Sequence, residues 1–359
     1  MAGMDSALEQ LAAAHGVATW YRDAKRRRVD IDADVVRRVL GLLGVSADNP
    51  AEIRDALAAT RAPRLPGTMV LRRGQQQRIS APGVLTAEDG SELPVTDSIP
   101  ADLAPGWYSL ASGNQRSTVL VAPPALPEPP RTWGWMLQLY ALHSANSWGL
   151  GDLGDLREFV TWTATTHGAG AVLVNPLHAV TPTHPVQASP YSPSSRRFVN
   201  PLYLRIADIA AYRRADPAVR AEVDALRVAP ATERIDYDAV WHAKQAALEL
   251  LWQADGMPRP TISGGLRDFA TFCALAQRHG RRWSQWPAEL RHPATASADP
   301  RLVAFHAWVQ QQCAEQLAAT RDAARDMAIG VIHDLAVGVD PEGADAWALQ
   351  DVLATGVTV

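Results

Sequence analysis

The side chains best suited to chemistry gather first in a proline-rich loop. Tyr191 lies in the stretch 176–201 and is flanked by Ser189 and Ser192. A phenol ring can stack on a sugar and donate a hydrogen bond, although composition alone favours a tyrosine that closes the loop over the core. Prolines restrict the freedom of the unfolded loop, which suits a preorganised binding surface. Ser189 and Tyr191 are therefore candidate substrate-binding residues.

A second group consists of carboxylates that cluster around the end of an apolar run. The run spans 330–337, and the group comprises Asp334, Asp340, Glu342 and Asp345. Barrel enzymes place functional acids at the carboxyl ends of strands. Surface solvation is the default interpretation for Glu342 and Asp345, so Asp340 is the better candidate for a site position.

The run Gly149–Gly154 satisfies the G-x-G-x-x-G pattern of dinucleotide-binding turns. In those turns the glycines follow their strand at once and approach a pyrophosphate. Here residues 141–148 intervene, and the next strand ends in Asn175-Pro176 rather than in an acidic residue. A nucleotide-dependent α/β enzyme is therefore the least favoured alternative.

Histidines and cysteines indicate neither a metal site nor a redox site. The ten histidines lack metal-ligand spacing, and a structural role is preferred for each, including His178 and His184 in the proline-rich loop. Cys273 and Cys313 lie in helix-patterned stretches without C-x-x-C spacing, which predicts buried thiols in a reducing compartment.

A β-α-β pattern must position the loop that carries Tyr191. Apolar runs at 133–140 and 171–175 flank a helix-period run at 155–167, and the loop follows the second strand. Parallel α/β folds place chemistry on such loops. A third strand is expected at 330–337, after helical stretches at 235–253, 265–282 and 300–328. A closed (β/α)8 barrel needs five more strands, so we expect the sequence to stop partway through a domain.

Four segments are expected along the chain. Residues 1–62 have helix-period apolar stripes, and residues 63–122 have short β-like runs typical of a small β-sandwich, for which a spacer role is favoured over sugar binding. Residues 123–130 contain five prolines and predict a semi-rigid linker at the main domain boundary. Residues 131–359 form the α/β domain, with a helical insertion at about 210–328.

Composition excludes several classes of partner. The net charge is −4, and the basic run Lys25–Arg28 is interpreted as a solvated helix end, so nucleic acid is not expected as a partner. No signal peptide or membrane-spanning run is found, and a cytoplasmic location is expected. Ten of the 12 tryptophans lie at or beyond residue 133, a weak indication of a carbohydrate substrate.

Seven short motifs, in order, resemble the 4-α-glucanotransferases of glycoside hydrolase family 77, also called amylomaltases. Each motif alone is modest, but their order across residues 133 to 355 is highly specific. They are Trp133–Tyr140, Ser147–Gly154, Asn175–His178, Ser189–Ser192, Asn200–Tyr203, Ile235–Asp238 and Trp283–Pro287.

The resemblance implies a multidomain protein in which residues 131–359 form the first part of a (β/α)8 barrel with helical insertions. It implies transfer of α-1,4-glucan segments between maltooligosaccharides by a retaining mechanism, without metal or organic cofactor. Tyr191 matches the aromatic residue that packs on the sugar at the cleavage point, and Ser189 lies beside it. Asp340 lies at the end of the third-strand motif, which contacts the same sugar.

The resemblance also implies that the catalytic carboxylates are absent from this chain. The nucleophile and the acid/base of the family are expected downstream of residue 359, and the acceptor-side loop is expected soon after Gly356. The chain alone is therefore expected to be inactive, and a non-catalytic glucan-binding fragment is the alternative. An incomplete barrel is expected to expose apolar strand edges and to aggregate.

Overall fold

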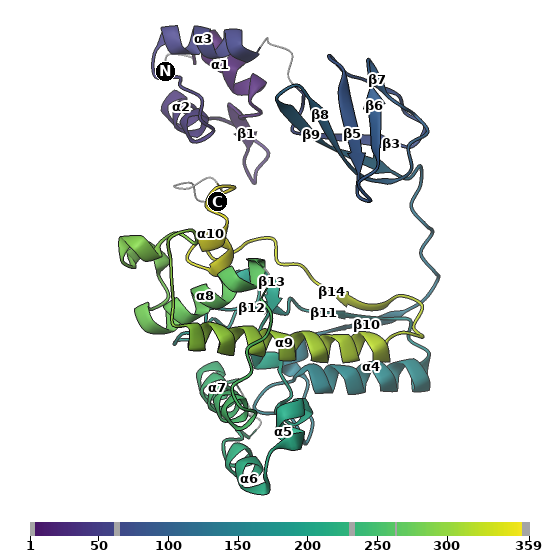
Figure 1. The fold of residues 1–359 in the computed structure, drawn as a ribbon, viewed down its shortest axis with the longest axis vertical. Helices are drawn as coiled ribbons and strands as arrows, with labels where there is room; N and C mark the ends of the chain where they lie inside the picture. Colours follow the sequence, from purple (N-terminus) through teal and green to yellow (C-terminus); the bar gives the residue numbers. More distant parts are fainter. Residues whose placement is uncertain (1–3, 61–64, 230–233, 263, 354–359) are drawn as a thin grey trace. The chain divides into compact units, whose positions relative to one another are not determined.

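The structure is a computed structural model that describes residues 4–60, 65–229, 234–262 and 264–353 (Figure 1). The expected boundary between residues 62 and 63, and the acceptor-side loop after Gly356, lie outside these ranges. The chain divides between Pro129 and Pro130 into two units, which are described separately.

The first unit begins with three helices, α1 (Ser6–Ala14), α2 (Ala33–Leu42) and α3 (Pro50–Thr60). Their apolar stripes bury Leu11, Leu40 and Ile53 in a common core. The helices flank a hairpin of β1 (Trp20–Arg22) and β2 (Arg28–Asp30).

The prediction of a helix end at Lys25–Arg28 is wrong, because these residues lie in the hairpin. The Asp23 carboxylate accepts hydrogen bonds from the backbone N–H groups of Lys25 and Arg27 at 2.8 Å. This side chain organises the turn, and Arg26 takes a positive φ of 60° within it.

The first unit continues as a five-stranded sheet in the order β3-β9-β8-β5-β6. Alternating side chains such as Leu71, Leu85 and Leu110 bury one face. The strands are β3 (Thr68–Arg72), β5 (Gly83–Ala87), β6 (Glu92–Val95), β8 (Gly106–Ser112) and β9 (Gln115–Ala122), and β4 (Gln77–Arg78) pairs with β7 (Ser98–Ile99).

The second unit is built on three parallel strands in the order β10-β11-β14, which confirms the three expected strands. They are β10 (Gly134–Leu137), β11 (Ala171–Val174) and β14 (Gly330–His333). All three are shorter than expected, β11 by a single residue. Residues Leu139–Ala141 form a 3-10 helix instead of extending β10, and beyond His333 only Asp334 N still bonds to Val174 O.

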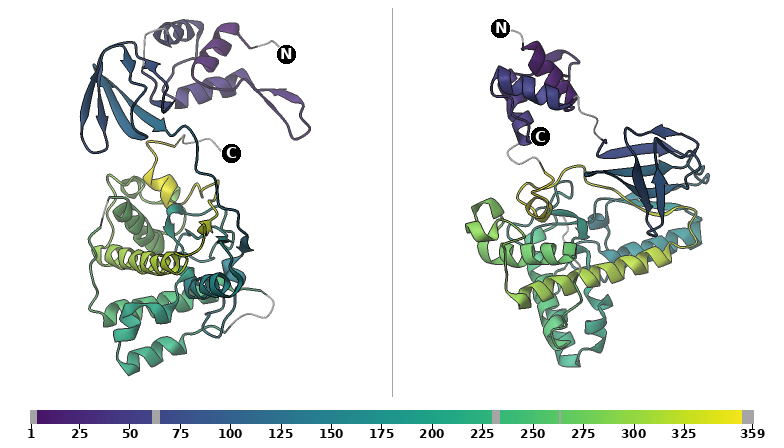
Figure 2. Two further views of the ribbon diagram at one scale, coloured as in Figure 1. Left: turned by 90° about the vertical axis from the view of Figure 1, so that its right-hand side faces the viewer. Right: turned by 45° about the horizontal axis from the view of Figure 1, so that its top comes forward.

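Helices α4 (Leu153–His167) and α9 (Pro300–Ala323) cover one face of this sheet (Figures 1 and 2). Val172 and Val174 point to that face and are fully buried. On the opposite face Met136 is 80% exposed and Ile332 is 38% exposed. The described ranges therefore form an open three-stranded sheet covered on one side, and they do not themselves close a barrel.

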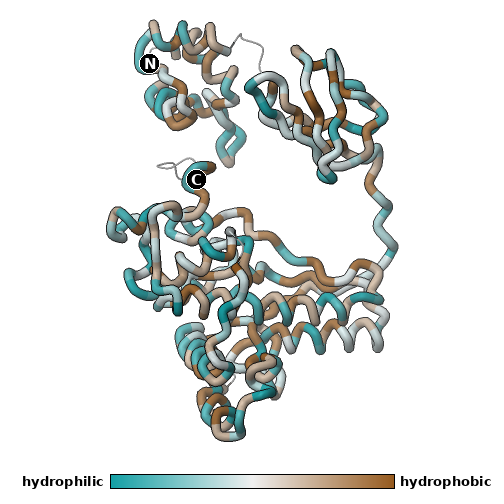
Figure 3. Tube along the Cα trace, in the orientation of Figure 1, coloured by the Kyte–Doolittle hydropathy of each residue, from teal (hydrophilic) through white to brown (hydrophobic). Residues whose placement is uncertain are grey.

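The crossover from β11 to β14 contains the remaining elements, and the expected helical stretches within it are confirmed. Figure 3 shows hydrophobic and hydrophilic residues alternating along α9, whose Phe305, Val309 and Cys313 are buried. The elements are β12 (His178–Ala179), β13 (Ser195–Val199), α5 (Ala210–Arg214), α6 (Pro217–Ala225), α7 (Tyr237–Ala254) and α8 (Gly264–His279), and α10 (Ala344–Ala348) follows β14. Within the ranges described, none of the helices combines the length and apolar character that a membrane crossing requires.

Candidate functional site

The loop that carries Tyr191 meets the turn at Asp340 beyond the carboxyl ends of β11 and β14. Asp340 N donates a hydrogen bond to Pro193 O at 2.8 Å. A Cβ atom on Gly338 would lie 3.7 Å from Tyr191 O, so these two segments pass close to each other. The structure thus brings the candidates of the loop and of the third strand into neighbouring positions.

The base of the loop is fixed by Asn175, the residue directly after β11. Its Oδ1 accepts a hydrogen bond from Leu139 N at 2.7 Å, and its Nδ2 lies 3.1 Å from Tyr203 Oη. Lys244 in α7 adds a second anchor by donating to the carbonyls of Leu202 and Leu204. These buried contacts join the ends of two strands to the segment where the loop returns.

The loop between 176 and 201 is partly regular. Strands β12 and β13 pair antiparallel within it, with His178 opposite Val199 and Ala179 opposite Ser195. Asn200 closes the hairpin, because its N–H donates to Leu177 O and its side chain accepts from Leu202 N. The segment with Tyr191 therefore projects from a short hairpin.

Tyr191 is exposed to 51% and does not close the loop over the core. Ser189 Oγ accepts a long hydrogen bond from Tyr191 N at 3.4 Å, which places the two candidates side by side. Among the residues that the structure describes, the Tyr191 hydroxyl has no hydrogen-bond partner. The ring and its hydroxyl are available to a ligand from solvent.

Asp340 is buried beside this loop, and its carboxylate is held on both oxygens. Oδ2 accepts from Arg281 Nη2 at 2.6 Å and from Arg281 Nε at 3.2 Å. Oδ1 accepts from Glu342 N at 3.0 Å. Contact between Asp340 and a sugar stays a prediction, and the structure places the carboxylate at the edge of the candidate site in a fixed orientation.

The default interpretation of Asp345 as a solvated surface group is wrong. Its side chain is 6% exposed, and it accepts hydrogen bonds from Ser195 Oγ at 2.7 Å and Arg196 N at 2.8 Å. Arg197 Nε adds an ion pair at 3.2 Å. Asp345 therefore fastens α10 to β13. Glu342 is partly buried and accepts from the Ser284 hydroxyl at 2.6 Å.

Arg281 lies at the candidate site and was not among the residues singled out from the sequence. Its guanidinium contacts Asp340 and also donates to Gln187 Oε1 at 2.9 Å. The available signal was its position two residues before the Trp283–Pro287 motif. Charge alone could not single it out, because Arg282 follows directly and shares its residue type.

The glycines of the G-x-G-x-x-G run serve close packing at the N-terminus of α4. A Cβ on Gly154 would lie 2.6 Å from Arg205 Cζ, and Gly149 has a φ of +75°. Asp152 and Asp155 cap the helix, and Arg205 forms ion pairs with both. Protein carboxylates thus occupy the helix end where a pyrophosphate would bind, which argues against the nucleotide alternative.

The two loop histidines have structural partners. His178 Nε2 lies 3.4 Å from Ala336 N, and burial together with the nearby charge of Arg196 lowers the pKa of His178. His184 Nδ1 lies 2.9 Å from Asp238 Oδ1.

The tryptophans divide between core and surface. Six of the ten at or beyond residue 133 are buried, namely Trp148, Trp241, Trp252, Trp286, Trp308 and Trp347. Core packing therefore explains most of the unusual tryptophan content, and it weakens the compositional indication of a sugar substrate.

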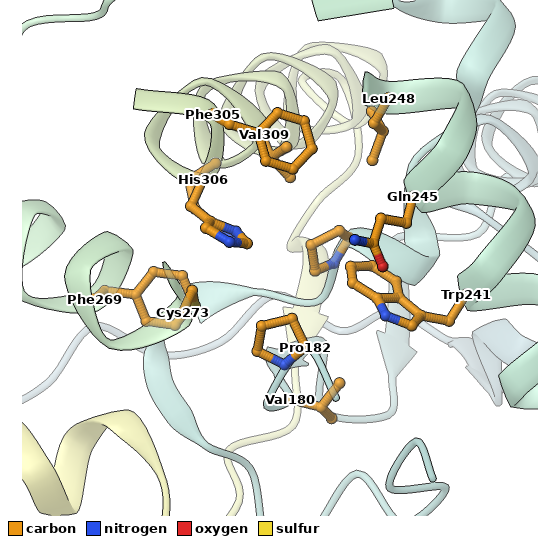
Figure 4. A pocket seen from close by; sticks show the side chains of 12 residues that line it. Val180, Pro182, Trp241, Gln245, Leu248, Phe269, Cys273, Phe305, His306 and Val309 are labelled. Atoms are coloured by element: carbon orange, nitrogen blue, oxygen red, sulfur yellow. The ribbon is translucent and has the colours of Figure 1, made fainter. Parts of the chain in front are cut away.

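A small pocket of about 20 Å³ lies between α7, α8, α9 and the loop residues Val180, Pro182 and Pro201. Figure 4 shows that Trp241, Leu248, Phe269 and Phe305 converge on it with His306. Its size admits about one water molecule, so it belongs to the packing of the core and cannot hold a sugar.

Comparisons with known proteins agree on one family. The family model described as 4-alpha-glucanotransferase matches residues 137–359. A 4-alpha-glucanotransferase of Mycobacterium tuberculosis is 40% identical over 428 residues, which cover 100% of this chain and 59% of the relative. A 4-alpha-glucanotransferase of Haemophilus influenzae is 29% identical over 303 residues, which cover 71% of this chain and 43% of the relative.

The fold agrees with a solved structure. The crystal structure of amylomaltase from Corynebacterium glutamicum superposes with a TM-score of 0.76 at 29% identity, covering 97% of this chain and 57% of that chain. The chain spans about 59% of the length of the mycobacterial relative.

Proposed function

Because the chain belongs to the 4-alpha-glucanotransferase family, glycoside hydrolase family 77, we propose that it supplies a sugar-binding part of an enzyme that transfers α-1,4-glucan segments between maltooligosaccharides. Ser189, Tyr191 and Asp340 are the proposed substrate-binding residues. The complete fold of such an enzyme is proposed to be a (β/α)8 barrel, to which β10, β11 and β14 contribute three strands.

The observation that carries the proposal is the placement of Tyr191. Its ring is half-exposed, its hydroxyl has no partner in the described part of the chain, and its loop is fastened at the carboxyl end of β11. An exposed aromatic ring on a loop that is fastened at its base offers a sugar an apolar face and a hydrogen-bonding group.

The proposed chemistry is a retaining double displacement. One carboxylate attacks the anomeric carbon while a second carboxylic acid protonates the leaving oxygen, which requires the two groups to lie about 5 Å apart. The second group then deprotonates the hydroxyl of the incoming glucan, whose oxygen attacks the anomeric carbon and displaces the first carboxylate. We assign neither role to a residue of this chain, since Asp340 and Asp345 are held by arginines and Glu342 by Ser284.

Calorimetric titration of the 359-residue chain with maltoheptaose tests the proposal. We expect saturable binding that is weakened roughly tenfold, about 1.4 kcal/mol, by Tyr191→Ala. Tyr21→Ala is the matched control, because Tyr21 is exposed to 53% in the hairpin of the first unit. Absence of binding, or an equal loss in both variants, would contradict the proposed site.

Incubation with maltotriose tests whether the chain only binds glucans, as proposed, or also catalyses glucan transfer by itself. We expect no glucose and no longer oligomers, because the reacting carboxylates are not assigned to this chain. Disproportionation would show that its own carboxylates catalyse transfer, and it would overturn that assignment.

A further inference from the structure

We propose that Arg281 is a positioning residue of the glucan site, which holds the Tyr191 loop and the Asp340 turn in one fixed arrangement. The inference rests on the proposed function, because it concerns how the side chains of that site are presented to a glucan. It goes further by assigning a role to a residue of the helical insertion, which follows α8 in the chain.

The guanidinium of Arg281 bridges two segments that are distant in sequence. Nη2 and Nε both donate to Asp340 Oδ2, at 2.6 Å and 3.2 Å. The same Nη2 group donates to Gln187 Oε1 at 2.9 Å. Nη2 serves both acceptors while Nε fixes the plane of the guanidinium on the Asp340 carboxylate, an orientation that a lysine ammonium group does not reproduce.

Gln187 carries the constraint onward to Tyr191. Its Nε2 donates to Ser192 O at 2.7 Å, so the side chain spans the segment that contains Ser189 and Tyr191. Both ends of the Gln187 amide are thereby used, one on Arg281 and one on the loop backbone. The hydrogen bond from Arg281 orients the Gln187 amide, and this amide in turn holds the loop segment at Ser192 O.

The Asp340 turn has further anchors. The loop is held at Pro193 by Asp340 N, and the hydrogen bond that links residues 188–192 to another segment of the described chain runs through Gln187. Trp283 Nε1 donates to Pro341 O at 3.0 Å, and Ser284 Oγ donates to Glu342 Oε1 at 2.6 Å. Loss of the Arg281 side chain would leave these two contacts in place. We therefore expect the turn to persist and the loop segment to lose its orientation.

Two features make the substitution informative. The Arg281 side chain is 40% exposed, so its replacement by methionine creates no enclosed cavity. The adjacent Arg282 is exposed and has no hydrogen bond or ion pair through its side chain among the described residues. Arg282→Met is therefore a control of identical chemistry one position away.

Titration of the 359-residue chain with maltoheptaose tests the role. We expect Arg281→Met and Gln187→Leu each to weaken binding about five- to tenfold, and Arg282→Met to leave it within twofold of the unchanged chain. Arg281→Lys should keep the pairing with Asp340 but bind as weakly as Arg281→Met. The two losses in Arg281→Met and Gln187→Leu should not add in the double variant, because both break one bridge.

A spectroscopic readout separates positioning from a general effect on stability. The chain is labelled with 3-fluorotyrosine, and the 19F resonance of Tyr191 is assigned by its absence in Tyr191→Phe. Without ligand, Arg281→Met and Gln187→Leu should shift or broaden this resonance and leave those of the other tyrosines unchanged. Melting temperatures of the variants should agree within a few degrees.

The outcomes are distinguishable. If Gln187→Leu and Arg281→Met bind maltoheptaose as the unchanged chain does, or if Arg282→Met is equally impaired, the positioning role is wrong. If the unchanged chain does not bind the sugar, the proposed function fails. The ligand-free 19F comparison then still decides whether Arg281 orders the loop, and an unchanged Tyr191 resonance would overturn it.

Discussion

At the scale of single residues, the hydrogen-bond donors around a buried carboxylate indicate its role more clearly than the extent of its burial does. Asp340 and Asp345 are both buried and lie close together in sequence. Asp345 accepts from Ser195 and from the Arg196 backbone, which commits it to joining α10 and β13. Asp345 also pairs with Arg197 of the same strand, whereas the arginine paired with Asp340 also donates to Gln187 in the loop that carries Tyr191. We therefore expect Asp345 to be structural and Asp340 to be the carboxylate that lies at the candidate site.

His306 is a buried residue whose protonation opposes folding. It lies in the core between α8 and α9 with its Nε2 3.0 Å from Gln277 Oε1, and burial lowers its pKa to about 4 from an ordinary value of 6.5. The unfolded chain therefore binds a proton more readily than the folded chain. The stability associated with neutral His306 is complete above pH 6.5 and is lost as the pH falls toward 4.

We predict that His306→Gln removes part of the acid sensitivity of the fold. Between pH 7.5 and 4.5 the unchanged chain should lose about 2 to 3 kcal/mol more stability than the variant, because glutamine does not titrate and keeps an amide near Gln277. Urea unfolding at a series of pH values measures this difference. Parallel pH profiles for the two proteins would contradict the prediction.

At the scale of elements, the start of α4 shows how a buried ionic cluster fastens the loop return to the sheet. Asp152, Asp155 and Arg205 have side chains that are 1%, 3% and 4% exposed. Burial raises the pKa of Asp152, while for Asp155 burial is outweighed by hydrogen bonds from serines, so that its pKa is lowered. The arginine is the common partner of both carboxylates.

We predict that Arg205→Met destabilises the second unit by about 3 to 5 kcal/mol, because it leaves buried carboxylates without their cation. Arg157→Met is the control, since Arg157 on α4 pairs with Asp208 in a partly exposed position, with side chains 32% and 21% exposed, and it should cost about 1 kcal/mol. Urea unfolding followed by tryptophan fluorescence reports on this unit. Equal losses in the two variants would contradict the prediction.

Periodicity predicted the elements well and the contacts of the site only in part. Helices α4, α7, α8 and α9 and the three parallel strands follow from apolar spacing, which is a local property. The hairpin at Asp23 was missed, because a side chain that caps a turn overrides the apparent helical pattern. Arg281 was missed because its partners, Gln187 and Asp340, are distant in sequence, and no local pattern encodes that pairing.

At the scale of the whole molecule, the open sheet of the second unit presents an apolar face. Met136 on β10 and Ile332 on β14 are 80% and 38% exposed, and Leu173 lies between them on β11. Exposed apolar sheet surface favours association with other chains. The expectation of aggregation made from the sequence remains a prediction, and this face is its structural basis.

We predict that Met136→Lys reduces self-association of the chain. Dynamic light scattering over a concentration series should show a smaller increase in mean radius for the variant. Leu126→Lys is the control, because Leu126 is 84% exposed in the proline-rich stretch and lies on no sheet. Identical behaviour of all three proteins would show that the sheet face does not drive association.

The fastening of β13 by Asp345 also sets an order of events during synthesis. The Ser195 hydroxyl and the Asp345 carboxylate are separated by 150 positions in the chain. At about 5 to 20 residues per second, a ribosome needs on the order of ten seconds to make the intervening stretch. Throughout that interval β13, which follows Tyr191 in the chain, lacks its contact with Asp345. The surface that would receive a sugar thus gains this contact only after Asp345 has been made.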